Sequence, residues 1–175
     1  EKDPQTVQEL TVIARAFVHL EKFQEANEVY RAAIEVDASY LEAHLSAAEL
    51  FTEKYNYADS AQFLQEALAL NPNSARAHLY VALNKRIEGG TKTGAALNRA
   101  LAINPNLVEA LTYKAGLELE EGEFVEAAAG IEKAFKVNPK SLDAYALRAA
   151  MLYLQDRAFE PEVTAALAIN PRYGT

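Results

Sequence analysis

The feature that most constrains this chain is an Asn-Pro dipeptide that returns at a nearly constant spacing. It occurs as Asn71-Pro72, Asn104-Pro105, Asn138-Pro139 and Asn170-Pro171. The spacing stays close to about 34 residues, a length typical of helical repeat proteins. One repeat length before Pro72 stands Asp37-Ala38, and one more repeat length before that stands Asp3-Pro4. Because proline disfavours helical geometry in the residue before it, each marker is expected to end a helix. The sequence therefore predicts a tandem array of one short helical unit.

Small and bulky residues hold fixed places relative to this marker. Five residues before it stand Ala33, Ala67, Ala100, Ala134 and Ala166, and eight before it stand Tyr30, Leu64, Leu97, Ile131 and Val163. These two places share one helical face, where the small residue lets two helices approach and the bulky one interlocks beside it. A further small column, Ala14, Ala48, Ala82, Ala115 and Ala149, marks an earlier helix in each unit. We expect helix pairs at about 5–20 and 23–36, 40–53 and 57–70, 74–88 and 91–103, 107–121 and 124–137, and 141–155 and 159–169.

The pattern resembles the tetratricopeptide repeat, a unit of about 34 residues with two antiparallel helices, small residues at fixed columns and a closing proline. The resemblance covers residues 7–171. It implies an all-α fold, a right-handed superhelix (an α-solenoid) of five helix-turn-helix pairs. The repeats are predicted at about residues 7–40, 41–74, 75–107, 108–141 and 142–173. Residues 1–6 then read as the tail of a preceding repeat, which makes the chain a fragment of a larger array.

The fifth unit departs from the pattern. It is two residues short, and Phe159 stands in a column that holds Ala26, Ser60, Thr93 and Ala127 in the other units. Pro161 falls where its second helix should begin, and proline is tolerated only in the first turn of a helix. We therefore expect a late start and a short last helix, with an apolar face that favours end-to-end association.

Composition excludes several classes of protein. The formal net charge is −8, and lysine and arginine are scattered, which argues against general nucleic-acid binding. No apolar run reaches the roughly 18 residues that a membrane-spanning helix needs, so no such segment is predicted. Cysteine is absent, which excludes disulfides and thiolate metal sites. The polar start contains no signal peptide, and the location of the protein stays open.

The sequence carries no constellation typical of an enzyme. His44 and His78 share a column, and we interpret them as core imidazoles rather than as a metal pair, since zinc needs three or four converging ligands. The run from Gly89 to Gly94 lacks the order of a phosphate-binding loop and is expected to be the turn between two helices. We therefore predict no catalysis, no metal and no cofactor.

In the tetratricopeptide family the first helices line a concave groove. Carrying the groove positions over gives candidate partner-binding residues in which tyrosine, arginine and leucine recur, and tyrosine and arginine are frequent anchors of protein interfaces. These residues are Arg15, Arg76, Leu79, Tyr80, Leu83, Arg86, Tyr113, Leu119, Leu147 and Tyr153. The resemblance thus implies a scaffold that binds a partner peptide or helix.

Other functions stay open at this point. Chaperone-binding members of the family grip a C-terminal carboxylate with Lys, Asn, Asn, Lys and Arg, and no window of repeats in this chain holds that set. The array could instead be a regulatory or substrate-presenting segment of a larger enzyme, such as a bacterial peptidase or glycosyltransferase. A third hypothesis is self-assembly, including homodimers, through stacked repeat ends.

Overall fold

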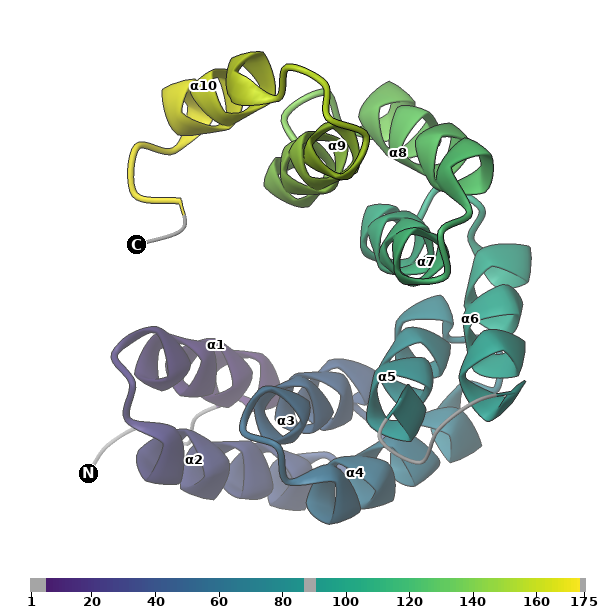
Figure 1. The fold of residues 1–175 in the computed structure, drawn as a ribbon. Coiled ribbons are helices and arrows are strands. Elements are labelled where there is room, and N and C mark those ends of the chain that lie inside the picture. The colour runs from purple at the N-terminus through teal and green to yellow at the C-terminus, as the bar shows by residue number, and fades with distance from the viewer. Residues whose placement is uncertain (1–5, 87–90, 174–175) are drawn as a thin grey trace. The chain divides into compact units, whose positions relative to one another are not determined.

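The computed structural model describes residues 6–86 and 91–173, with the backbone alone for residues 91–93. Those residues form ten α-helices and no strand (Figure 1). They are α1 (Val7–His19), α2 (Phe23–Val36), α3 (Leu41–Glu53), α4 (Tyr57–Leu70), α5 (Ala75–Lys85), α6 (Thr91–Ile103), α7 (Val108–Glu120), α8 (Phe124–Val137), α9 (Leu142–Leu154) and α10 (Glu160–Ile169). The predicted all-α fold of helix pairs is confirmed. Residues 87–90, which include the predicted glycine turn, lie outside the described part.

The helices belong to two compact units. Unit 1 spans Glu1–Ile103 and contains α1 to α6, and unit 2 spans Asn104–Thr175 and contains α7 to α10. Each odd-numbered helix packs most extensively on the even-numbered helix that follows it (Figure 1). Within a unit, each odd-numbered helix also contacts the next odd-numbered helix. The first helices of neighbouring repeats therefore form one continuous layer in each unit.

The asparagine of the repeat marker forms a side-chain hydrogen bond in the turn that follows the helix. The side-chain Oδ1 of Asn71 accepts a hydrogen bond of 3.0 Å from the backbone N–H of Asn73. Equivalent bonds of 2.9 to 3.1 Å follow Asp37, Asn104, Asn138 and Asn170. An Asx side chain can make this bond and so stabilise the turn in which proline stops the helix. The same turn thus forms after all five second helices.

The small columns form the contacts between paired helices. Ala14, Ala48, Ala82 and Ala115 are fully buried, as are Ala33, Ala67, Ala100 and Ala134. In unit 2 the approach is so close that a Cβ added at Gly130 would lie 3.2 Å from the Cβ of Ala115. The bulky column is equally buried in repeats one to four, where Tyr30, Leu64, Leu97 and Ile131 are at most 2% exposed.

The fifth repeat breaks the bulky column, as its shortened sequence indicates. Helix α10 begins at Glu160 with Pro161 in its first turn and has ten residues. Val163 belongs to the bulky column but is 41% exposed, and Leu167 is 40% exposed. Val163 therefore lacks the burial of its counterparts, because in the described residues no further helix covers this side of α10.

Candidate binding surface

The first helices of unit 1 are linked by a network of charged side chains. Glu42 of α3 accepts hydrogen bonds from Arg15 of α1 and from Arg76 of α5. Arg76 Nη1 lies 2.8 and 3.1 Å from the two carboxylate oxygens of Glu42, and its Nη2 lies 3.2 Å from Oε2 of Glu49. Two arginines and two glutamates therefore alternate across three helices, an arrangement that fixes the orientation of long side chains.

Ser46 and Tyr80 extend this network. Ser46 accepts hydrogen bonds of 3.2 and 3.0 Å from Nε and Nη2 of Arg15. Burial, the hydrogen bond to Glu49 and the charge of Glu49 all raise the pKa of Tyr80 far above its usual range, so its phenol stays protonated. We call the surface formed by Arg15, Glu42, Ser46, Glu49, Arg76 and Tyr80 the charged face. Its arginine and glutamate side chains are all between 30% and 44% exposed, so they are ordered by their partners yet reachable from solvent.

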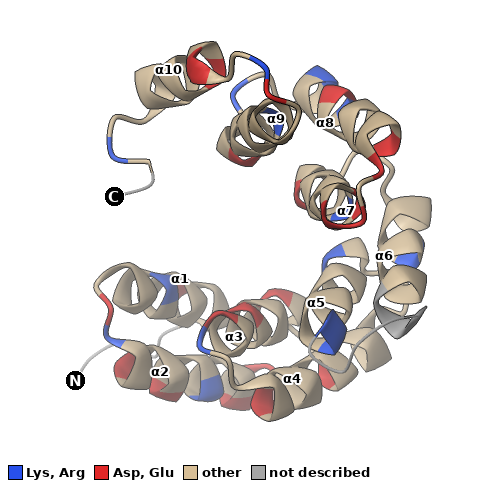
Figure 2. Ribbon diagram, in the orientation of Figure 1, with Lys and Arg blue, Asp and Glu red and all other residues tan. Residues whose placement is uncertain are grey.

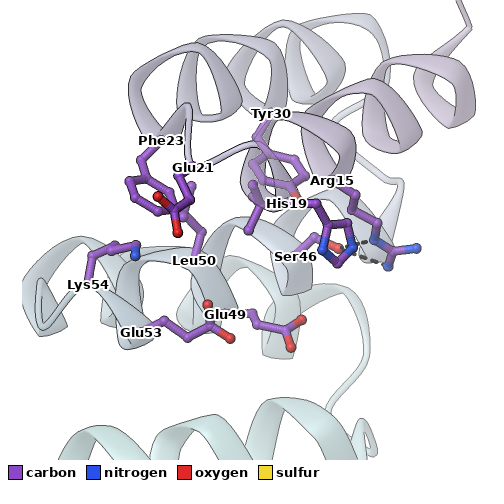
Figure 3. Close-up of a pocket in the computed structure, with 11 residues that line it drawn as sticks. Arg15, His19, Glu21, Phe23, Tyr30, Ser46, Glu49, Leu50, Glu53 and Lys54 are labelled. Carbon is purple, nitrogen blue, oxygen red and sulfur yellow. Dashed lines mark hydrogen bonds between the residues drawn. The ribbon is translucent and has the colours of Figure 1, made fainter. Parts of the chain in front are cut away.

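A cleft of about 580 Å³ opens beside the charged face, between α1 and α3 (Figure 3). Its apolar wall includes Val18, Phe23, Tyr30 and Leu50, and its polar side chains are Arg15, His19, Glu21, Ser46, Glu49, Glu53 and Lys54. Figure 3 shows Glu49 and Glu53 side by side on α3, across the opening from Phe23 and Tyr30. We call this space the α1–α3 cleft.

The charged residues of the cleft affect the pKa of Glu53 in opposite directions. Burial and the neighbouring charge of Glu49 raise the pKa of Glu53, while Lys54 and His19 act in the opposite direction. Two of the cations also have contacts elsewhere, since Arg15 contacts Glu42 and Ser46, and Lys54 Nζ lies 3.4 Å from the centre of the Phe23 ring. In the described residues Glu53 has no hydrogen bond or ion pair of its own.

The predicted partner-binding residues of unit 1 differ in accessibility. Arg15, Arg76 and Tyr80 belong to the charged face, Leu83 is half-buried, and Arg86 is exposed directly after α5. Leu79 is only 4% exposed because it faces inward from α5. Its place at the binding surface is therefore a misassignment, and Leu79 supports the surface from beneath.

In unit 2 the predicted residues do not form a comparable network. Leu119 is 8% exposed and is thus a second misassignment, because it packs inside the unit. Tyr113 and Leu147 are half-buried, and Leu147 Cδ2 would lie 3.6 Å from a Cβ added at Gly116. Tyr153 is 65% exposed and packs edge-on against Phe159, with ring centres 5.5 Å apart.

Arg148 of unit 2 is bound by residues of two second helices. The Arg148 guanidinium of α9 binds Glu162 of α10 at 2.6 Å and Glu132 of α8 at 3.2 Å. It also lies 4.3 Å from the centre of the Phe135 ring. The Arg148 side chain is 28% exposed, so it is more enclosed than Arg15 or Arg76. We interpret this cluster as structural, because it joins three helices of the unit.

Glu42, Ser46 and Glu49 occupy groove positions of the second repeat but are not among the predicted partner-binding residues. A signal for them exists in the repeat register: Glu42 and Arg76 are one repeat length apart, as are Arg15 and Glu49. The ion pairs Arg15–Glu42 and Glu49–Arg76 both span 27 residues. Opposite charges at these two offsets indicate contacts between neighbouring first helices.

The histidines differ from each other in burial. His44 is 3% exposed, with Nε2 2.9 Å from the carbonyl oxygen of Ala38 and Nδ1 3.0 Å from Glu66. His78 is only half-buried, so the expected core position is wrong for that residue, and its Nε2 lies 3.0 Å from the carbonyl oxygen of Pro72. Among the residues described, no group of three or more histidines and carboxylates could hold a metal ion.

Two other classes of partner are nucleic acids, which require clustered basic residues, and membranes, which require a long apolar helix to cross them. Figure 2 shows basic positions spread singly over the helices, interleaved with acidic ones. Over the described ranges, no helix combines the length and the apolar character needed to cross a membrane.

No model of a known protein family matches the chain. No curated protein matches it either. Several solved structures, however, are similar to it. A tetratricopeptide repeat protein from Parabacteroides merdae has a TM-score of 0.82 and 20% identity, covering 97% of this chain and 67% of that one. A thermophilic TPR protein from Thermus thermophilus has a TM-score of 0.82 and 13% identity, covering 96% of this chain and 93% of the other.

A third solved structure is YrrB, described as a TPR protein with an unusual peptide-binding site. It has a TM-score of 0.56 and 18% identity, covering 94% of this chain and 86% of YrrB. Because the sequence identities are so low, these matches concern the fold alone. The periodic columns, the ten paired helices and the matches agree, and they show that this chain has the tetratricopeptide repeat fold.

Proposed function

We propose that the protein is a non-catalytic scaffold whose charged face in unit 1 binds an extended segment or a helix of a partner protein. The observation that carries the proposal is the exposure of an ordered network on the first helices, where Arg15, Glu42, Glu49 and Arg76 hold one another in place. Side chains that are already ordered lose less conformational entropy when a partner binds. A surface of this kind favours specific recognition over general adhesion.

The composition of the charged face supports the same role. Arginine and tyrosine are enriched among the residues that dominate binding energy, and the face offers Arg76 beside Tyr80. The half-buried Tyr80 ring packs on the core of unit 1, which makes it a rigid contact. A TPR protein with a peptide-binding site, YrrB, lies among the similar structures, which makes peptide recognition the natural starting hypothesis.

Partner capture with a double variant and a matched control tests this function. Tyr80→Ala combined with Arg76→Ala is expected to weaken capture of partners from a native lysate at least tenfold, the effect of losing about 1.4 kcal/mol or more of binding energy. Tyr55→Ala is the matched control, because Tyr55 is 80% exposed and lies in the turn before α4. Circular dichroism of each variant verifies that the helices are intact.

The result that would reject the proposal is an unchanged set of captured proteins with the Arg76 and Tyr80 variant in its folded form. Equal losses with that variant and with Tyr55→Ala would also reject it, because the effect would then not depend on the charged face. The residues of unit 2, Tyr113, Leu147 and Tyr153, form a second and separate target for the same assay.

A second candidate function is self-association, and the observation that favours it is the apolar surface of α10. Val163, Leu167 and Ile169 are each about 40% exposed on a helix with no charged residue after its first turn. Light scattering over a range of concentrations tests this. A rise in mass that Leu167→Glu abolishes supports it, and a constant monomer mass at high concentration contradicts it.

A further inference from the structure

The α1–α3 cleft combines two kinds of surface that a long cationic side chain needs. Phe23 lies along one side of the opening, and Tyr30 and Leu50 lie at its base with exposures of 1% and 3% (Figure 3). Aliphatic stems of lysine and arginine pack well against accessible apolar groups while the charged end stays in a polar environment, and the half-buried Val18 and Phe23 provide such groups in the lining. On the opposite side the carboxylates of Glu49 and Glu53 project from successive turns of α3.

The carboxylate of Glu53 is the free acceptor of this arrangement. Glu49 is engaged by Arg76 and Tyr80, whereas Glu53 has no hydrogen bond or ion pair in the described residues. The pKa of Glu53 is raised by burial and by the charge of Glu49, and the charges of Lys54 and His19 offset these effects only in part. A cation placed beside it would supply the remaining compensation.

The cations of the cleft perform this role only in part, because Lys54 and His19 lower the pKa of Glu53 without cancelling the effects of burial and Glu49. The guanidinium of Arg15 is held by Glu42 and Ser46, and Lys54 lies over the face of the Phe23 ring. His19, from the end of α1, is the third basic residue of the lining. Glu21, Glu49 and Glu53 contribute three carboxylates to the lining, and in the described residues neither Arg15 nor Lys54 forms an ion pair with any of them.

We propose that the α1–α3 cleft binds the lysine or arginine side chain of the partner segment, with the stem against Val18 and Phe23 and the charge at Glu53 and Glu49. This inference rests on the proposed function, since it names the kind of residue that the charged face selects. The net charge of −8 favours a basic partner over a second copy of this acidic chain.

A titration with a small probe tests the cleft without knowledge of the partner. The probe is n-butylammonium, which reproduces the end of a lysine side chain, and n-butanol is its neutral control. In ¹H–¹⁵N spectra at pH 7.5, n-butylammonium is expected to shift the amides of Phe23, Leu50 and Glu53 in a saturable manner, with a Kd in the order of millimolar for so few atoms. Butanol is expected to shift them at least twofold less at equal concentration.

Variants assign the binding to Glu53. Glu53→Gln is expected to weaken n-butylammonium binding about two- to fivefold, the range of a solvent-accessible ion pair. Glu35→Gln is the matched control, since it removes the same charge from an exposed position on α2 outside the cleft. Glu53→Lys, which places a cation in the cleft itself, is expected to abolish saturable binding.

Two outcomes would overturn the inference. Equal shifts with butanol and with n-butylammonium would mean that the cleft has no preference for cations. Equal weakening by Glu35→Gln and Glu53→Gln would mean that only the total charge matters. Neither outcome changes the result expected for partner capture with the Arg76 and Tyr80 variant. Conversely, if that variant captured partners normally, the titration result would still stand. The two proposals can therefore be rejected separately.

Discussion

Unit 1 and unit 2 are built from the same repeat but use their charged residues differently. In unit 1, Arg15 and Arg76 lie on the first-helix layer, where their side chains are 44% and 37% exposed and pair with glutamates of α3. In unit 2, Arg148 is 28% exposed and joins α9 to α8 and α10. The comparison indicates that the repeat columns determine the core, while the residues between them determine whether a charge is available for binding.

The two units also differ in how completely they bury their bulky column. Leu64 in unit 1 is 1% exposed, whereas Val163, in the same column of unit 2, is 41% exposed. A bulky residue in this column is therefore buried only where a neighbouring helix covers it. The variants below test these contrasts.

The largest effect is expected from truncation of the bulky column. Leu64→Ala should lower the free energy of unfolding by about 2–5 kcal/mol, because it removes buried methyl groups and leaves a cavity. Val163→Ala should lower it by less than about 1 kcal/mol, since an exposed side chain leaves no cavity. Urea denaturation of both variants measures the difference, and equal losses would show that our assignment of the column is wrong.

Arginine truncation should separate the structural cation from the surface cation. Arg148→Ala is expected to cost about 1–3 kcal/mol, because Glu162, whose side chain is 18% exposed, would lose its partner and Phe135 would lose a cation–π contact. Arg15→Ala should cost less than about 1 kcal/mol, in the range of exposed ion pairs. Thermal unfolding of the two variants provides the measurement, and the reverse order would contradict the contrast between the units.

The turns between the two helices of a repeat provide a smaller test, in which two substitutions are expected to change the stability in opposite directions. Gly122 in unit 2 has φ of +79°, and Tyr55 in unit 1 has φ of +59° at the corresponding turn. Gly122→Ala should destabilise the protein by about 1 kcal/mol, because a Cβ is disfavoured in this conformation. Tyr55→Gly should be neutral or slightly stabilising for the same reason. Chemical denaturation that shows a loss for both would indicate that the side chain of Tyr55 matters more than its backbone.

Much of the fold could be predicted from the sequence because the repeat supplies the same information five times. The periodic alanines and the Asx-Pro markers predicted the helix pairs, and α2, α4 and α8 have the expected bounds. The shortened sequence around Phe159 and Pro161 predicted the late start of α10. The reason for asparagine in the marker, a side-chain bond to the next turn, became clear only from the structure.

The binding surface was less predictable, since a groove position specifies a helix face only approximately. Leu79 and Leu119 occupy groove positions but turn inward, because a rotation of one helix by a fraction of a turn exchanges surface for core. Glu53 shows the converse, because it has no hydrogen bond or ion pair in the described residues although Glu49, one turn earlier on the same helix, binds Arg76. Which of several nearby charges form an ion pair depends on side-chain geometry, and the spacing of the residues in the sequence does not determine it.

Photo-crosslinking tests the central claim, that the first-helix face of unit 1 contacts the partner. A benzoyl-phenylalanine placed at Val12, which is 64% exposed and precedes Arg15 by one turn of α1, is compared with one placed at Val125, which is 79% exposed on α8. The account predicts partner adducts from position 12, lost with Arg76→Ala and Tyr80→Ala, and none from position 125. Adducts from position 125 alone would contradict it.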